Sequence, residues 1–195
     1  MYGKTRTGIG LQPIVDSEGV LLTKPMGGSL ADAALEGRLF CCATQTAINM
    51  STTLNTTFVG WALTNPTGSG KLVIVHEFAY GVTAKVTAET LLALATTTDS
   101  GMTTAEFAPR CCRNAYATSV CTVRDGGSIV APVIERIIGQ IVSGTDDVSY
   151  GGMVPNIVPL DGSIVLAPGR ALVTDSTVAP GAVMQFSYMW EEVDE

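Results

Sequence analysis

The sequence predicts an all-β protein, a jelly-roll-like β-sandwich with an extended N-terminal arm. Thr, Val and Ile are frequent from Gly37 onward, and these residues favour strands. Gly, Pro and Asn interrupt the apolar runs at intervals of about ten residues, as in short strands joined by tight turns. No part of the sequence shows the spacing of apolar residues that is typical of a long amphipathic helix. These three observations favour a sandwich or jelly roll over an α/β fold.

The first 36 residues differ from the rest of the chain. They are rich in Gly and Pro and hold only short apolar runs, which is poor material for a core of their own. We therefore predict an extended arm over residues 1–36, with a helical turn or two at 29–35. Residues 37–195 form the predicted β-sandwich domain.

Ten strands are expected within that domain. The last is the clearest, because Met184, Phe186, Tyr188 and Trp190 alternate onto one face and place an aromatic row in a core. Residues 87–95 and 133–141 are compatible with either helix or strand. The expected strands are 38–43, 45–50, 57–64, 71–81, 85–95, 117–124, 129–138, 163–167, 171–175 and 182–191.

Four short segments carry turn residues between apolar runs. They are Asn65–Gly70, Asp125–Gly127, Asp161–Gly162 and Pro168–Gly169. Gly, Asn and Asp tolerate the left-handed conformations that tight turns require, and Pro presets the first turn position. We expect each of these segments to connect two strands.

Few residues are charged. Charged side chains make up 15% of the chain, with a net charge of −7, against about 25% charged residues in typical domains. With so few charged residues, part of the surface must be apolar, which predicts a partner that covers it. The acidic balance argues against nucleic acid, and no apolar run reaches membrane-helix length. With no secretory-signal pattern, we expect synthesis in a cytoplasm. Four of the last five residues are acidic, and we expect residues 191–195 to form a solvated tail.

The five cysteines are expected to be small buried hydrophobic residues of a reduced compartment. Their number is odd, no C-x-x-C is present, and neighbours on a strand face opposite ways, so the pairs Cys41–Cys42 and Cys111–Cys112 do not present two metal ligands to one site. A bridge between strands stays open, because sequence alone does not give its connectivity.

No residue pattern selects an active site. Gly68-Ser69-Gly70-Lys71 lacks the first Gly and the final Ser or Thr of a phosphate-binding loop, and a hairpin turn explains it. His76 is the only histidine, which excludes a two-histidine metal site. In the strand 71–81 it shares a face with Leu72, Ile74, Phe78 and Tyr80, so we expect a core residue. We predict a non-enzymatic protein without cofactor or metal.

The C-terminal third resembles a known family. Gly162-Ser-Ile-Val-Leu-Ala-Pro-Gly-Arg-Ala-Leu172 precedes Gly181-Ala-Val-Met-Gln-Phe-Ser-Tyr-Met-Trp-Glu-Glu192. This pattern is similar to the closing strands of jelly-roll virion proteins of tailed bacteriophages. The hairpin at 58–80 is similar to one in the same proteins, so the resemblance lies in two patches of the chain. It implies a capsid cement or decoration protein on the virion surface, commonly a homotrimer.

The predicted function is therefore structural: the protein binds itself and the major capsid protein, or another virion scaffold, and stabilises the head between capsid subunits. The arm residues expected to make contacts are Tyr2, Lys4, Arg6, Leu11 and Ile14. The alternative is a tail or spike component that binds a receptor or carbohydrate. It predicts that Trp61 or Tyr116 is exposed beside Asn or Asp, whereas Trp61 and Trp190 otherwise belong to the core.

Overall fold

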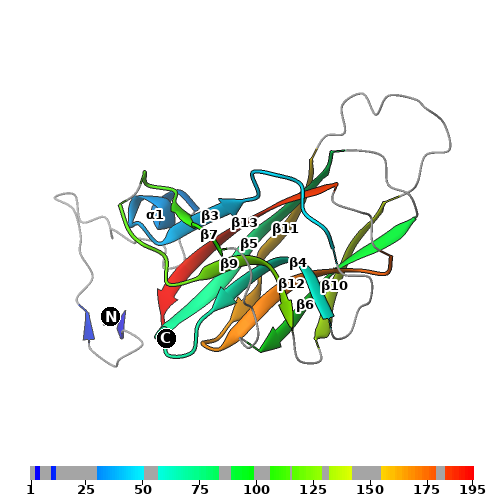
Figure 1. Ribbon diagram of the computed structural model, residues 1–195. Coiled ribbons are helices and arrows are strands. Elements are labelled where there is room, and N and C mark those ends of the chain that lie inside the picture. Colours follow the sequence, from blue (N-terminus) through cyan, green and yellow to red (C-terminus); the bar gives the residue numbers. More distant parts are fainter. Residues whose placement is uncertain are drawn as a thin grey trace.

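The computed structural model consists almost entirely of antiparallel strands (Figure 1). It describes residues 3–4, 10–11, 30–50, 57–83, 89–98, 106–114, 116–128, 132–141, 155–178 and 183–195. The elements are β1 (Gly3–Lys4), β2 (Gly10–Leu11), α1 (Leu30–Leu35), β3 (Leu39–Ala43), β4 (Thr57–Asn65), β5 (Lys71–Val82), β6 (Thr90–Thr98), β7 (Glu106–Phe107), β8 (Arg110–Cys111), β9 (Thr122–Ser128), β10 (Val133–Ile141), β11 (Asn156–Leu166), β12 (Arg170–Ser176) and β13 (Met184–Asp194).

Two large sheets carry the fold. The six-stranded sheet has the order β10-β6-β12-β4-β9-β7, and the five-stranded sheet has the order β11-β5-β13-β3-β8. Eight of these strands pair from the outside of the sequence inward: β3 with β13, β4 with β12, β5 with β11, and β6 with β10. This nested pairing is the strand order of a jelly roll. The predicted fold class is confirmed.

Aromatic side chains join the two sheets. Trp61 of β4 stacks on Tyr188 of β13 with ring centroids 6.4 Å apart, and it meets Phe107 edge-on at 4.8 Å. The Tyr188 hydroxyl donates to the Trp61 carbonyl across the interface at 3.4 Å. Trp61 and Trp190 are completely buried, so their predicted core positions are confirmed. Contacts between facing sheets are what make the fold a sandwich.

The six-stranded sheet is buried on its other face too. Strand alternation puts Ala62, Ala95, Ala171 and Val173 on the side opposite the main core, and they form a second buried cluster. Asp175 lies on this face of β12 and is 1% exposed. Burial raises the pKa of its carboxyl to about 6, although a 2.8 Å hydrogen bond from the Ser176 amide opposes the shift.

Strand β13 lies in the middle of the five-stranded sheet, between β3 and β5 (Figure 1, red). As predicted, Met184, Phe186, Tyr188 and Trp190 all face the core. Phe186 and Tyr188 both contact Phe78 of β5, with ring centroids 5.8 and 5.1 Å away.

Strand β5 contains a β-bulge. Met189 of β13 pairs with Glu77, but the next residue, Trp190, pairs with Val75, so His76 is the extra residue. The bulge reverses the alternation. Val75 and Phe78 both face the core, and His76 does not share their side. The prediction of a core histidine on the same side as Phe78 and Tyr80 is therefore wrong: His76 lies with Leu72 and Ile74 on the outer, half-buried side of β5.

Two predicted turns are confirmed. Residues 65–70 join β4 to β5, and the side chain of Asn65 holds this turn by donating to the carbonyls of Lys71 and Leu166 at 2.8 and 2.9 Å. Pro168 and Gly169 join β11 to β12. The other two predictions are wrong. Asp161 and Gly162 have positive φ, but they lie within β11, where the register with β5 shifts, and do not connect two strands. Residues 125–127 lie within β9.

Several strand predictions need correction. Residues 45–50 are not a strand, because Ile48 makes only one isolated bridge, to Met184. The amides of Thr44 and Ile48 both donate to carbonyls of β13, and residues 45–47 between them do not pair with it. The ambiguous segments are extended from Thr90 onward in β6 and throughout 133–141 in β10. The short strands β7 and β8 and the first half of β11 were not predicted. Residues 85–88, 129–131 and 182, which fell in predicted strands, lie outside the described residues.

Helix α1 confirms the predicted helical turns. It ends where Gly37 adopts a positive φ of 74°, and the amides of Gly37 and Arg38 bond back to the carbonyls of Ala34 and Ala33. This is a common glycine-terminated helix end. Ala33 is buried and α1 contacts β3, so this part of the predicted arm packs against the five-stranded sheet. The boundary at residue 36 stays a prediction.

Candidate functional site

The largest group of exposed aliphatic side chains lies on two edge strands. Strand β10 ends the six-stranded sheet and β11 ends the five-stranded sheet. Ile137 on β10 and Ile157 on β11 are 61% and 62% exposed. We call these residues together the β10–β11 edge: Val133, Ile134, Ile137, Ile157 and Val165. Several exposed apolar side chains gathered on sheet edges mark a candidate interaction site in a soluble protein.

The two edge strands are tied to each other. The guanidinium of Arg136 on β10 donates to the carbonyl of Pro159 at 3.3 Å and to the hydroxyl of Ser163 at 3.5 Å, both on β11. Strand β10 also has register shifts after Ile134 and after Ile137. Such bulges hinder the addition of another strand by backbone pairing. The edge can therefore contact a partner chiefly through its aliphatic side chains.

A polar cluster lies on the outer face of the five-stranded sheet. Glu191 of β13 forms an ion pair with Arg38, and its second carboxylate oxygen is 3.3 Å from Nε2 of His76. Arg38 also donates through Nε to Glu36 at 2.9 Å. The bulge in β5 thus brings the only histidine of the chain to a carboxylate.

The chemistry available to His76 is limited. Burial lowers the pKa of its imidazole, and the nearby Asp161 carboxylate partly opposes this. Among the described residues, no serine, threonine or cysteine side chain hydrogen-bonds to His76. A neutral imidazole beside a carboxylate resembles two parts of a catalytic triad, but the nucleophile is not placed with them.

Glu192 occupies a buried position on the core side of β13. Its carboxylate accepts hydrogen bonds from the Ser119 hydroxyl, from the Val120 amide at 3.1 Å, and from Nε1 of Trp190 at 3.1 Å. These bonds fasten the segment before β9 to the last strand. Glu191 and Glu192 are both buried, so the prediction of a solvated tail is wrong for these two residues. Ion pairs and hydrogen bonds stabilise these two carboxylates in positions that composition alone suggested would be exposed.

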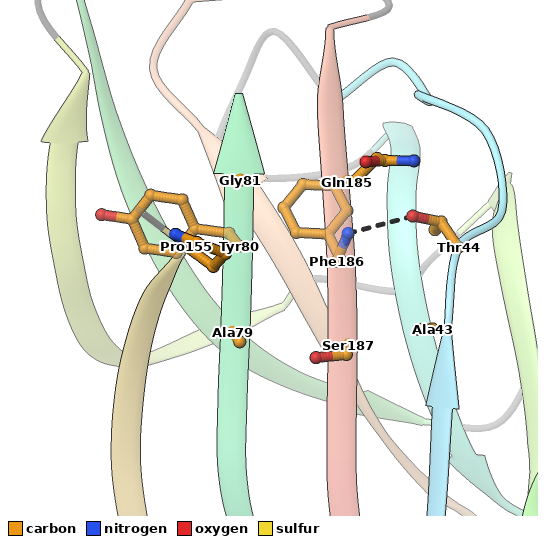
Figure 2. Close-up of a pocket in the computed structure, with 9 residues that line it drawn as sticks. All are labelled: Ala43, Thr44, Ala79, Tyr80, Gly81, Pro155, Gln185, Phe186 and Ser187. Atoms are coloured by element: carbon orange, nitrogen blue, oxygen red, sulfur yellow. Dashed lines mark hydrogen bonds between the residues drawn. The ribbon is translucent and has the colours of Figure 1, made fainter. Parts of the chain in front are cut away.

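A shallow groove crosses the outer face of the five-stranded sheet (Figure 2). It has a volume of about 200 Å³, and small side chains such as Ala43, Ala79 and Ser187 line it. Figure 2 shows the Tyr80 hydroxyl directed away and the Phe186 amide donating to the Thr44 hydroxyl, at 3.1 Å. Binding sites for small molecules usually measure about 300–1,000 Å³, and no charged group lines this one.

A larger hollow lies beside β3. Its volume is about 610 Å³, and its walls include Cys41, Phe107 and Arg110. The alternation predicted for the cysteines is confirmed: Cys42 and Cys111 are buried, while Cys41 is half-buried and Cys112 exposed. The prediction that all five are buried is therefore wrong for Cys41 and Cys112. Cys121 is buried.

The two aromatic residues expected to be exposed in a carbohydrate-binding module, Trp61 and Tyr116, differ in burial. Trp61 is fully buried and cannot stack on a sugar, whereas Tyr116 is 62% exposed. The guanidinium of Arg113 covers one face of the Tyr116 ring, 4.0 Å from the centroid. Tyr116 thus offers at most one free face to a ligand.

The predicted arm contacts are only partly described. Lys4 and Leu11 lie in β1 and β2, which pair antiparallel with Gly3 opposite Leu11 and Lys4 opposite Gly10. Tyr2, Arg6 and Ile14 lie outside the described residues. The role of all five in binding a partner stays a prediction.

Two further observations bear on the function. Over the described ranges, no three His, Cys, Asp or Glu side chains gather as metal ligands would. The helical part of these ranges contains no segment with the length and hydropathy of a membrane span. No known protein family, curated protein or solved structure matches this chain. The geometry of the β10–β11 edge therefore carries the functional argument.

Sequence reasoning missed this edge. The signal available was the run 133–141, whose apolar residues fit neither a clean helical nor a clean strand period. In the structure, the two bulges in β10 explain that irregularity, because each one reverses the alternation. The neighbouring position of β11 depends on long-range pairing, which no local pattern reports.

Proposed function

We propose that this protein is a non-enzymatic structural module that assembles into a homotrimer through the β10–β11 edge. The observation that carries the proposal is the exposure of five aliphatic side chains on two adjacent edge strands. Leaving such a surface in water is costly, at about 25 cal/mol per Å² of apolar area. Closed cyclic symmetry covers the same surface on every copy without open-ended polymerisation.

The low charge of the chain supports the same proposal. Only 15% of the residues are charged, and both charged side chains on the exposed part of β10 have partners within the chain: Glu135 accepts from the Thr96 hydroxyl at 2.7 Å, and Arg136 bonds to β11. Interface centres are depleted in unpaired charge in the same way. A second copy could therefore pack on the edge without burying an unpaired charge.

The narrower proposal is a capsid cement or decoration protein of the virion, bound between major capsid proteins. It rests on the sequence resemblance at 162–172, 181–192 and 58–80, and the jelly-roll order agrees with it. If the sandwich domains form a trimer through the β10–β11 edge, the residues before α1 are left to contact a larger scaffold. This is the role predicted for Tyr2, Lys4, Arg6, Leu11 and Ile14.

Solution mass by light scattering tests the assembly. We expect a trimer for the unmodified protein and a monomer for the double variant Ile137→Glu/Ile157→Glu, because buried unpaired carboxylates would oppose association by several kcal/mol. Both sites are exposed in the single chain, so the fold should tolerate the change. Circular dichroism on the same samples checks this.

Leu35→Glu is the matched control. Leu35 is also a highly exposed aliphatic residue, but it lies on α1, away from the edge. This variant should keep the trimer. A monomeric unmodified protein at all concentrations, or a trimer that survives the double substitution, would contradict the proposal.

Tyr116 favours the alternative, a receptor- or carbohydrate-binding module of a tail or spike. Its ring is exposed, and Asn114 is two residues away in the sequence. Titration with oligosaccharides should then change the tyrosine emission of the unmodified protein and leave Tyr116→Ala without a binding signal. An unmodified protein that is monomeric and binds sugar would favour this function over the structural one.

A further inference from the structure

Two cysteines meet on the outer face of the β3–β8 ladder. Phe40 pairs with Cys111, Cys41 pairs with Arg110, and the Cys112 amide donates to the Leu39 carbonyl at 2.9 Å. Side chains alternate along each strand. Cys41 and Cys112 therefore share the outward side of two adjacent chain segments, far apart in sequence, while Cys42 and Cys111 face inward and are buried.

The two outward thiols are close enough to influence each other. A hydrogen bond and the charge of Cys41 both help to raise the pKa of Cys112 to about 12, although burial is the largest cause. Cys112 is exposed and Cys41 is half-buried. Cys41 also lines the 610 Å³ hollow beside Arg110, so a small oxidant can reach this side of the pair.

We propose that Cys41 and Cys112 form a reversible intramolecular disulfide when the protein meets a low-molecular-weight disulfide such as oxidised glutathione. The thiolate of one cysteine attacks the glutathione disulfide, forms a mixed disulfide and releases one glutathione thiolate. The second cysteine, as thiolate, attacks the protein sulfur of the mixed disulfide and releases the second glutathione. The two cysteines lose two protons, and their two electrons reduce the oxidised glutathione to two thiols.

The position of this bridge gives it a structural consequence. Strand β8 has only two residues and ends the five-stranded sheet. It leads to Ser119 and Val120, which donate to the buried carboxylate of Glu192. A bond between Cys41 and Cys112 would hold this edge to β3 and close a long loop of the chain, and such cross-links stabilise chiefly by restricting the unfolded state.

Intact mass spectrometry of the full chain, incubated with oxidised glutathione at pH 8.5, tests the inference. We expect a species that has lost two hydrogen atoms, and a non-reduced digest in which the peptide of Cys41 is linked to that of Cys112. The oxidised protein should melt at a higher temperature than the reduced one, and dithiothreitol should reverse both changes.

Single variants separate this bridge from others. Cys41→Ser and Cys112→Ser should each stop at one glutathione adduct, whereas Cys42→Ala should still form the bridge, because Cys42 faces the core. Glutathione adducts on the unmodified protein without an internal bridge would overturn the inference. So would a bridge that maps to other cysteines or links two chains.

Discussion

Replacing Glu192 by alanine should lower the free energy of unfolding by about 2–4 kcal/mol, because its carboxylate accepts three hydrogen bonds. The substitution leaves the Ser119 hydroxyl, the Val120 amide and Nε1 of Trp190 without their acceptor. An unsatisfied buried donor costs about 1–3 kcal/mol. Equilibrium unfolding in urea, followed by tryptophan emission, measures the difference.

Two companion variants define what the carboxylate contributes. Glu192→Gln keeps one acceptor oxygen, so it should lose roughly half as much stability as the alanine variant. Asp194→Ala changes an exposed acid two residues along β13, whose partner is Lys71 at 2.5 Å. An exposed pair contributes little, so this variant should stay within about 0.5 kcal/mol of the unmodified protein. An equally small change for Glu192→Ala would show that the three donors find other partners.

Asp175→Asn should stabilise the protein at neutral pH. Burial raises the pKa of the Asp175 carboxyl to about 6 in the folded state, from 3.8 in the unfolded chain, so the folded state binds this proton more tightly. The stability that the protonated carboxyl gives is fully present below pH 3.8. It is lost as the pH rises to about 6, and above that the ionised group destabilises the fold.

The expected gain from this substitution follows from the size of the shift. One pKa unit corresponds to about 1.4 kcal/mol, so the gain above pH 7 is at most about 3 kcal/mol. Asparagine resembles the protonated acid in size and shape, and the gain should therefore vanish near pH 3.5. Thermal melts of both proteins between pH 3.5 and 8 measure it.

Asp125→Asn, on the less buried strand β9, is the control and should follow the unmodified protein across the range. A constant difference between the Asp175→Asn and unmodified proteins at every pH would show that the effect comes from packing rather than from charge.

Local patterns predicted the parts of the fold that depend on local physics. The alternation in 184–190 gave the correct buried face, and the turns at 65–70 and 168–169 follow from residues that favour those conformations. The all-β class follows from the same signals. These features need no knowledge of which strands lie side by side.

The errors arise where long-range pairing overrides local pattern. His76 does not share a face with Phe78 and Tyr80, because one extra residue in β5 is accommodated opposite β13. Asp125 and Gly126 were expected in a turn, but they lie in a strand opposite a second register shift, in β4. Glu192 is buried because Ser119 and Val120, far away in the sequence, donate to its carboxylate together with Trp190 of its own strand. The β10–β11 edge and the Cys41–Cys112 pair have the same origin, since each joins segments that the sequence separates.

The central position of β13 has a consequence for biosynthesis. The five-stranded sheet cannot close until residues 184–194 have been made, because β13 separates β3 from β5. A ribosome that has already produced β3 to β12 therefore carries a chain whose Phe40 and Phe78 have not yet been covered by the aromatic side chains of β13. Nested pairing of distant segments also makes folding slow, on the order of milliseconds to seconds. Nascent chains of this protein should bind chaperones until the last strand emerges.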